Sequence, residues 1–195
     1  MATRRRLPHV YPDGRWLFLT WHLFGSLPTA AFPPSSKLTA GQAFVWMDRY
    51  ADSARSGPLF LKQAMVAQIV CDSFMTGIEL GHYELGAFVV MANHVHGLLR
   101  PRISLSQLLQ SLKGFTARQA NKALKRTGEP FWQRECYDHW VRDEAEWARI
   151  AAYIEENPVK AGLVARAEDF PWSSANRVWR ERVAGLVMSS KAGSG

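Results

Sequence analysis

The stretch MANHVHGLLRP, residues 91–101, decides the fold and the site expected of this chain. It places His94 and His96 one residue apart at the start of an apolar run. Because a β-strand sends residues i and i+2 to the same face, the two imidazoles would point the same way while Val95 turned into the core. Such a pair can bind a metal ion, or it can be two polar residues on the solvent side of a sheet. A divalent ion needs at least a third ligand, which this stretch does not contain.

The composition indicates a basic protein with an anionic partner. The 195 residues carry 24 Lys and Arg against 17 Asp and Glu, a formal net charge of +7 with a pI of about 9.7. This balance suits a polyanion, and nucleic acid is the first candidate. Cys71 and Cys136 are too few and too far apart for a disulfide framework or a CxxC metal site, which fits a reducing cytosol. The first hydrophobic run, WLFLTWHLF, is short and interrupted by His22, so no membrane span or signal peptide is expected.

Four segments have the pattern of β-strands. Residues 15–23 are rich in aromatic and β-favouring residues and follow the turn signal PDG. Residues 82–92 and 94–101 are two β-like runs joined by a turn near Asn93, which predicts an antiparallel hairpin. A turn and a short β-like segment are expected within residues 128–141.

Helical spacing of apolar residues predicts the remaining elements. The expected helices are 39–57, 58–77, 104–126 with an interruption at Gly114, and a last helix from the N-cap Asp143 to a stop at Pro158. The resulting order is β, α, β, β, α, β, α without an internal repeat. We therefore expect a single domain over residues 1–188, followed by a disordered tail over residues 189–195.

One face of the predicted helix 104–126 is basic. It carries five cations and no acidic residue from position 113 onward: Lys113, Arg118, Lys122, Lys125 and Arg126. Positions 118, 122 and 125 would share one side of the helix. Such a row is usually a solvated face, but in a basic protein without counter-charges nearby it favours a surface that follows phosphates.

The last predicted helix carries two polar side chains beside its apolar stripe. Tyr153 and Asn157 are four residues apart and so lie next to each other on one flank. In one interpretation Tyr153 packs at the edge of the core and Asn157 ends the helix before a proline. In the other, Asn157 supplies the missing ligand to a metal held by His94 and His96, and Tyr153 presents its hydroxyl to a phosphate bound by that metal.

Several segments closely resemble the REP-associated tyrosine transposases, a branch of the single-tyrosine transposases in the HUH endonuclease superfamily. They are MANHVHGLL, LKGFTARQANKAL, PFWQRECYDHWVRDEAEWARIAAYIEENPVKAGLV and FPWSSA, and the similarity extends to YPDGRWLFLTWHL near the N-terminus. It covers nearly the whole chain except the tail. An HxH pair alone is a weak signal, but HxH followed about fifty residues later by YIxxNPVxAG is highly specific.

The resemblance assigns roles to individual residues. The HUH motif of the family falls on His94 and His96, its nucleophile on Tyr153, and its polar residue beside the metal on Asn157. Two positions depart from the pattern. Ala92 stands where relatives often have proline, which changes turn stiffness but removes no chemical group. In mobile insertion-sequence relatives the third ligand is usually glutamine, so ligation by the shorter asparagine is less secure than ligation by the histidines.

The resemblance also implies a fold and an activity. It implies an α+β, ferredoxin-like antiparallel sheet with helices packed on one face. It implies attack by Tyr153, assisted by Mg²⁺ or Mn²⁺, on single-stranded DNA beside a hairpin such as a repetitive extragenic palindrome (REP). The products are a 5′-phosphotyrosine and a free 3′-hydroxyl that allows strand transfer. We further expect a bacterial cytoplasmic protein near the nucleoid, acting as a monomer in cis or as a homodimer in trans.

Some expectations remain open at the level of sequence. We expect the two histidines to face solvent, and exposed members of the set Trp132, Tyr137, Trp140 and Trp172 could stack unpaired bases. The alternative function is a protein that binds or regulates hairpin DNA without cutting it. A zinc-stabilised non-enzymatic fold is a weaker alternative, since no thiol lies near the histidine pair in sequence.

Overall fold

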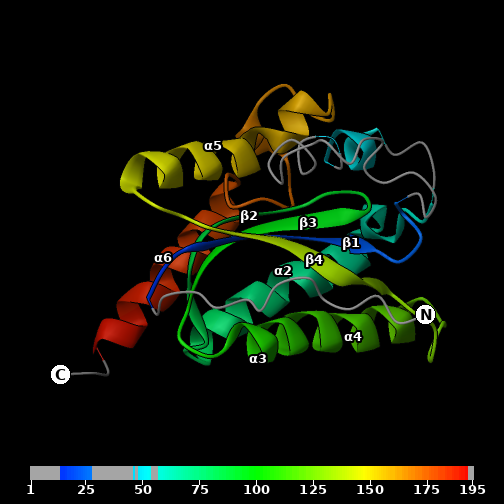
Figure 1. Cartoon of the computed structure of the whole chain (residues 1–195), viewed down its shortest axis with the longest axis horizontal. Coiled ribbons are helices and arrows are strands. Elements are labelled where there is room, and N and C mark those ends of the chain that lie inside the picture. The colour runs from blue at the N-terminus through cyan, green and yellow to red at the C-terminus, as the bar shows by residue number, and fades with distance from the viewer. Residues whose placement is uncertain (1–13, 28–45, 47, 54–56, 193–195) are drawn as a thin grey trace.

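Four antiparallel strands form one sheet in the order β2-β3-β1-β4 (Figure 1). The computed structural model describes residues 14–27, 46, 48–53 and 57–192. The strands are β1 (Leu17–Leu23), β2 (Tyr83–Val90), β3 (His94–Pro101) and β4 (Trp132–Trp140). Each lies where the sequence predicted a strand, and β4 is a nine-residue strand rather than a short segment.

The predicted hairpin of β2 and β3 is confirmed, with residues 91–93 as its connection. Strand β3 lies between β2 and β1. Its register with β1 pairs His96 with Thr20 and His94 with His22. Because directly opposite residues of an antiparallel pair share a face of the sheet, β1 places Thr20 and His22 beside the histidine pair.

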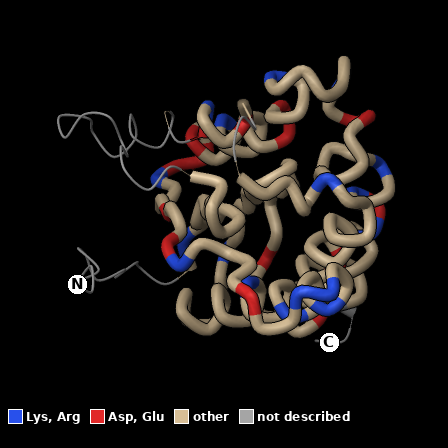
Figure 2. Tube along the Cα trace, turned by 90° about the vertical axis from the view of Figure 1, so that its right-hand side faces the viewer, with Lys and Arg blue, Asp and Glu red and all other residues tan. Residues whose placement is uncertain are grey.

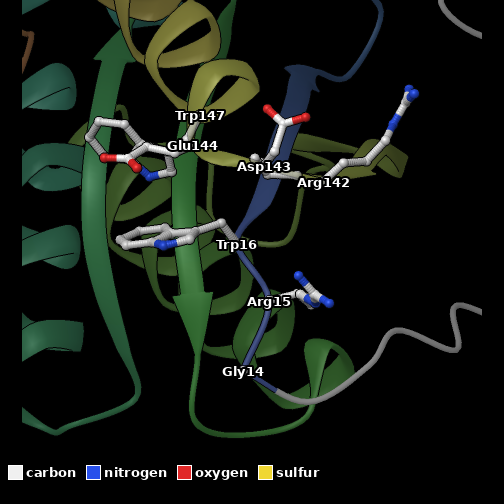
Figure 3. A pocket seen from close by; sticks show the side chains of 8 residues that line it. Gly14, Arg15, Trp16, Arg142, Asp143, Glu144 and Trp147 are labelled. Carbon is white, nitrogen blue, oxygen red and sulfur yellow. The ribbon is translucent and has the colours of Figure 1, made fainter.

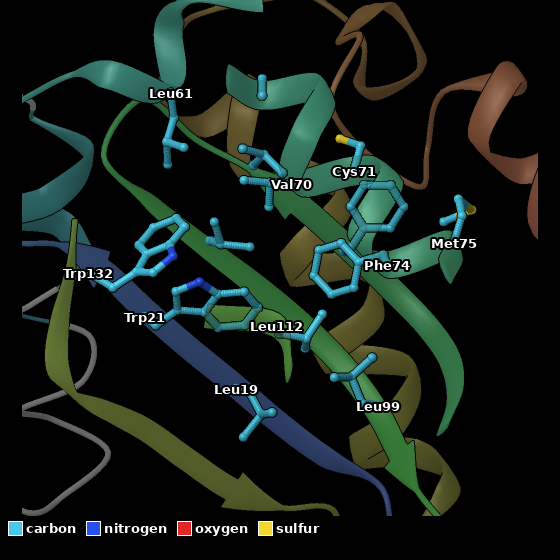
Figure 4. Close-up of a cluster of buried hydrophobic side chains, with 14 of the residues drawn as sticks. Leu19, Trp21, Leu61, Val70, Cys71, Phe74, Met75, Leu99, Leu112 and Trp132 are labelled. Atoms are coloured by element: carbon cyan, nitrogen blue, oxygen red, sulfur yellow. The ribbon is translucent and has the colours of Figure 1, made fainter. Parts of the chain in front are cut away.

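One face of the sheet packs against most of the helices and forms the larger core (Figures 1 and 4). The helical elements of this layer are η1 (Phe60–Lys62), α2 (Ala64–Glu79), α3 (Leu105–Leu109), the π-helical turn η2 (Gln110–Gly114), α4 (Phe115–Ala123) and α6 (Arg177–Ala192). Strand β1 contributes every second side chain to this core: Leu17, Leu19, Trp21 and Leu23. We call this the α2 face.

The opposite face packs against α5 (Glu144–Lys160), which lies over β2 and β3. Its predicted apolar stripe contacts Phe18, Val89 and Leu98 in a second, smaller cluster. The expected α+β class with an antiparallel sheet is confirmed, and the helices lie on both faces of the sheet because α5 carries an apolar stripe that must be buried. We call this the α5 face.

Several helix ends differ from the prediction. In place of one helix over 58–77, the structure has the short turn η1 and then α2, which begins at Ala64 and continues past Gly77 to Glu79. The expected interruption at Gly114 is a π-helical turn, and α4 ends at Ala123 rather than continuing to residue 126. Lys125, with φ of 57°, lies beyond that end in the left-handed conformation. Helix α5 does not stop at Pro158. It continues to Lys160, since a proline ring in the last turn displaces only one hydrogen bond of a helix that is held by packing.

Helix α6 was not predicted, and its last residues reach Ala192, inside the segment expected to be disordered. It packs on α2, where Arg182 lies 2.6 Å from a carboxylate oxygen of Asp72. Of the helix predicted over 39–57, residues 46 and 48–52 are helical, and much of the rest lies outside the described residues. Within the described part of the chain, no helix has the length and apolar character needed to cross a membrane.

Candidate metal and nucleophile site

His94 and His96 lie at the start of β3 on the α5 face, and both are fully buried. The expectation that they face solvent is therefore wrong, because α5 and the helical residues 48–52 cover this end of the sheet. Each ring is held through Nδ1. Nδ1 of His94 lies 2.8 Å from Oδ1 of Asn93, and Nδ1 of His96 lies 2.7 Å from Oγ1 of Thr20. With the proton on Nδ1, both Nε2 atoms present lone pairs to one region.

Asp48 joins the pair from the helical residues 48–52. Its Oδ1 atom lies 3.0 Å from Nε2 of His96 and 3.8 Å from Nε2 of His94. Ligand atoms of the three buried residues all lie within 4.8 Å of one another, which is close enough to hold one metal ion. Two imidazoles and a carboxylate form a ligand set that many divalent ions accept.

Asn157 reaches the same point from α5. Its side chain is buried, with Nδ2 3.4 Å from Nε2 of His96, and its Oδ1 atom has no hydrogen-bond partner among the described residues. A 180° rotation of the amide group would exchange Nδ2 and Oδ1, so that Oδ1 would lie beside the donor atoms of His96 and Asp48, where a cation could bind. The structure thus brings Asn157 to the histidine pair, as the sequence predicted. Its ligation of a metal remains a prediction.

The donor atoms fit a cation. Among the residues that the structure describes, five buried polar atoms in this region have no hydrogen-bond partner: Oδ1 of Asp48, Oδ1 of Asp52, Nε2 of His22, Nε2 of His94 and Oδ1 of Asn157. A buried polar atom left unpaired costs about 1–3 kcal/mol, so five together are unusual in a folded protein. A divalent cation would satisfy the lone pairs of Asp48 and His94, which belong to the cluster of ligand atoms.

The charges of the site follow from burial. Burial lowers the pKa of His94 well below its usual range, and the neighbouring His96 lowers it further. Burial would raise the pKa of Asp48, but contact with the histidines outweighs this and lowers it. Burial and the charge of Asp48 raise the pKa of Asp52 to about 7. A neutral His94 beside an ionised Asp48 is the protonation state that metal binding requires.

Tyr153 is half-buried and lies beside this cluster. Its hydroxyl donates a hydrogen bond to Oδ2 of Asp48, and its ring packs edge-on against Phe18 and His96. One carboxylate of Asp48 therefore contacts both the histidine pair and the tyrosine. A cavity of about 510 Å³ opens here, lined by Asp48, Arg49, Asp52, Tyr153, Asn157 and Lys160.

The five predicted DNA-contacting residues are not brought to this cavity. They belong to the layer of helices on the α2 face, and basic residues of the chain are blue in Figure 2. Lys113 donates to the backbone carbonyls of Gln133 and Arg134, and Arg126 pairs with Glu129. Both side chains already have partners within the protein, so the expectation of a face without a counter-charge does not hold at Arg126, which pairs with Glu129.

Arg118, Lys122 and Lys125 are exposed. Arg118 and Lys122 lie one turn apart on α4, whereas Lys125 lies past the end of the helix. The prediction that all three share one helical face is therefore wrong for Lys125. Their contact with DNA stays a prediction.

Of the four aromatic residues expected to stack bases, Trp132 is buried in the larger core, and its Nε1 donates to Thr116. Trp140 is the most exposed of them, at 39%. A second cavity, of about 500 Å³, lies at the N-terminal end of α5, where Trp16 and Trp147 form one wall (Figure 3). No histidine lines it, and it lies at the opposite end of β1 from His22.

Sequence reasoning missed Asp48 and Asp52. The signal was present in the segment WMDRYAD, where two aspartates four residues apart fall on one side of a predicted helix. Nothing in the local pattern indicates that this helix covers the end of β3. The pair could only have been found by asking which acidic residues might complete the metal site.

Comparisons with known proteins agree with this geometry. Residues 60–157, about half of the chain, match the family described as "Transposase IS200 like". The matched segment contains both histidines, Tyr153 and Asn157 but not Asp48. A solved structure of a REP-associated tyrosine transposase bound to a REP hairpin superposes with a TM-score of 0.56 at 20% identity, covering 89% of this chain and 82% of that one. At that identity it shows a shared fold.

Two curated relatives come from Haemophilus influenzae. One, named as a REP-associated tyrosine transposase, is 32% identical over an alignment of 107 residues that covers 49% of this chain and 60% of the relative. The other is an uncharacterised protein, 32% identical over 99 residues covering 39% of this chain and 54% of the relative. The chain thus aligns with little more than half the length of these relatives. The family match, the shared fold and the convergence of the motif residues at one site show that the chain belongs to the IS200-like transposases and resembles their REP-associated branch.

Proposed function

We propose that this protein is a metal-dependent DNA-nicking and strand-transfer enzyme. Its substrate would be single-stranded DNA beside a hairpin such as a repetitive extragenic palindrome, the ligand of the related solved structure. The observation that carries the proposal is the position of Asp48, which bridges a cluster of metal-ligand atoms and the hydroxyl of Tyr153. A nucleophile and a metal site must lie this close to act on one phosphate.

We propose the metal ligands from the positions of the donor atoms. His94, His96 and Asp48 would hold the ion, and Asn157 would add its amide oxygen. When bound, Mg²⁺ or Mn²⁺ would polarise the scissile phosphate and stabilise the charge that develops on it. The absence of thiolates from this donor set argues against a structural zinc site, and the choice of Mg²⁺ or Mn²⁺ follows from the family resemblance.

The protein's own side chains would prepare the nucleophile. A tyrosine hydroxyl has a pKa near 10 in water, so it attacks poorly unless its proton is accepted and its oxygen is oriented. The carboxylate of Asp48 accepts that hydrogen bond, and the ring of Phe18 fixes the tyrosine from the side. Attack on phosphorus would form the Tyr153 ester bond at the 5′ side and break the bond to the 3′-oxygen, which leaves with a proton.

The arrangement favours cleavage in cis. Tyr153 contacts Asp48 of its own chain, so a single copy brings nucleophile and metal ligands together. A homodimer that exchanges its tyrosine helix would have to break this contact first. The bacterial cytoplasmic location expected from the sequence stays a prediction.

The test is the formation of a covalent tyrosyl-DNA adduct. Purified protein is incubated with labelled single-stranded oligonucleotides that carry REP hairpins, in the presence of Mn²⁺, and the products are separated on a denaturing gel. Wild-type protein should become linked to the 5′ phosphate of the fragment downstream of the cut and should release an upstream fragment that ends in a free 3′-hydroxyl. Tyr153→Phe keeps the ring and its packing, so it should bind the hairpin but form no adduct.

Tyr137→Phe is the matched control. Tyr137 packs against Phe18 in the same cluster, yet it lies on β4 and does not line the cavity of the site. Its variant should still form the adduct. Hairpin binding by the wild-type protein without any adduct would instead support the non-cleaving alternative, and an adduct at residue 137 would contradict the proposed mechanism.

A further inference from the structure

The continuation of α5 through Pro158 adds a residue to the side of the helix that faces the site. Tyr153, Asn157 and Lys160 are spaced i, i+4 and i+7, so they form one stripe. The helix closes immediately afterwards, where the N–H of Ala161 donates to the carbonyl of Asn157 and Gly162 adopts a φ of 70°. Had the helix stopped before Pro158, Lys160 would not share this stripe.

The ammonium of Lys160 lies against the ring of Tyr153. Its Nζ atom is 4.6 Å from the ring centroid, and the side chain lines the same 510 Å³ cavity as Asp48 and Asn157. Among the residues that the structure describes, Nζ has no hydrogen bond and no ion pair within 4.0 Å. Lys160 therefore carries a positive charge beside the proposed nucleophile that no described carboxylate contacts within 4.0 Å, and this charge acts on the pKa of Asp52 in the same cavity, opposing its rise.

A phosphate needs such a charge in this cavity. The carboxylates of Asp48 and Asp52 lie on its wall, and a DNA strand that approached them without a counter-charge would be repelled. A metal ion would neutralise this charge on the histidine side. Lys160 contacts the ring of Tyr153, whose hydroxyl contacts Asp48, so its ammonium lies near a phosphate bound at that hydroxyl.

We propose that Lys160 is a further catalytic residue, whose ammonium binds a non-bridging oxygen of the phosphate that Tyr153 attacks. This inference rests on the proposed function. In the reaction the Tyr153 oxygen–phosphorus bond forms, the bond to the 3′-oxygen breaks, and the tyrosine proton ends on that oxygen. Lys160 keeps its protons throughout and acts by stabilising the negative charge on the non-bridging oxygen.

A purely structural role has a different signature. A lysine in the last turn of a helix interacts favourably with the helix dipole, and its contact with an aromatic ring adds packing. Such a residue would affect stability but not the reaction of bound substrate. The experiment must therefore separate the chemical step from folding and from general attraction to DNA.

The first measurement is single-turnover cleavage at saturating DNA. Lys160→Met keeps the length of the side chain and removes the charge, and it should slow cleavage about a hundredfold, as loss of a charge-stabilising donor does. Lys160→Arg should retain most of the rate. Arg149→Met, which removes an exposed cation from the same helix outside the cavity, should cleave like the wild type.

A modified substrate identifies the contact. A methylphosphonate at the scissile position replaces one non-bridging oxygen by a methyl group, and its two diastereomers remove the two oxygens separately. For the diastereomer that lacks the oxygen bound by Lys160, wild type and Lys160→Met should cleave at equal rates. An equal loss in Lys160→Met on the phosphodiester and on both diastereomers would overturn the proposal, as would an unchanged rate on the phosphodiester.

A measurement of DNA affinity tests the role of Lys160 even if no cleavage occurs. In the Tyr153→Phe background, Lys160→Met should reduce the slope of log affinity against log salt by about 0.7 for an oligonucleotide that spans the cleavage site. If wild-type protein forms no adduct but this slope changes, the proposed function fails and Lys160 remains a phosphate ligand. If the slope does not change, Lys160 does not contact phosphate, whatever the cleavage assay shows.

Discussion

The α2 face and the α5 face of the sheet are made by the same strands, and β1 shows how differently they are used. Toward α2 the strand presents leucines and Trp21, all within the larger core. Toward α5 it presents Phe18, Thr20 and His22, and the last two are buried next to the histidine pair. Both faces bury apolar area, which stabilises the fold, but the α5 face also buries the polar cluster at the start of β3, where several atoms lack a hydrogen-bond partner among the described residues.

The contrast explains how such a site can exist. Unpaired buried atoms each cost about 1–3 kcal/mol, so the cluster around Asp48 and His94 must destabilise the protein when no ligand satisfies it. The core on the α2 face offsets this cost. Changes to the core on the α2 face should therefore lower stability whether or not metal is present, and changes to the polar cluster on the α5 face should act through ligand binding.

The largest expected effect on stability comes from Phe74→Ala. Phe74 is fully buried on α2, with ring centroids 4.9 Å from Phe88 and 6.0 Å from Trp21 (Figure 4). Its truncation should lower the free energy of unfolding by about 3–5 kcal/mol, measured by denaturant titration. Phe115→Ala, at a residue that is 41% exposed, is the control and should cost much less. Equal losses in the two variants would break the distinction between core and surface on this face.

The next effect is on stabilisation by metal. At a Mn²⁺ concentration a hundred times its dissociation constant, binding to the folded state should add about 2.7 kcal/mol to wild-type stability. His96→Ala removes a ligand atom and should abolish the increase in Tm that Mn²⁺ causes. His82→Ala, in the turn before β2, should keep it. A Tm that rises equally with Mn²⁺ in His96→Ala would exclude His96 as a ligand.

The two faces also differ in how far the sequence predicted them. The aromatic and β-favouring residues of 15–23 and the hairpin near Asn93 predicted the sheet, since both signals are local in sequence. The pairing of β1 with β3, which brings Thr20 to His96, depends on residues far apart in sequence. No local pattern predicts that contact. Helix α6 was not predicted because its many basic and polar residues weaken the helical pattern of the apolar residues that pack in the larger core.

The candidate site was predicted in part. His94, His96, Tyr153 and Asn157 were assigned through the resemblance, and the structure brings them together. The burial of the histidines was not predicted, because the strand alone cannot show that α5 covers it. The position of Lys160 could not be predicted for a related reason. A proline usually ends a helix, which would leave Lys160 outside α5. Here the packing of the apolar stripe of α5 on the sheet outweighs the one hydrogen bond lost at Pro158.

A smaller effect should follow from Thr20→Val. The hydroxyl of Thr20 lies 2.7 Å from Nδ1 of His96 and orients the ring, whereas valine keeps the shape without the polar group. Loss of such a supporting contact lowers metal affinity about 10- to 100-fold, measurable by Mn²⁺ titration. Thr76→Val, at an exposed position of α2, should leave affinity unchanged. Wild-type affinity in Thr20→Val would show that the ring is held by its packing alone.

The smallest expected effect concerns the exposed cations in the layer on the α2 face. Arg118, Lys122 and Lys125 have no hydrogen bond or ion pair to other described residues, so they are free to contact phosphates. Replacing all three by glutamine should weaken binding to every hairpin alike. It should also reduce the slope of log affinity against log salt by about 0.9 for each contact with a duplex stem.

Lys113→Gln provides the matched comparison for these cations. Its ammonium donates to the carbonyls of Gln133 and Arg134, which ties η2 to β4. Because this charge is already used within the protein, its loss should lower stability and leave the salt slope nearly unchanged. The opposite result would mean that Lys113 releases β4 to bind DNA. If instead the triple variant kept the wild-type slope, α4 would present an ordinary solvated surface, and the hairpin stem would have to contact cations elsewhere on the protein.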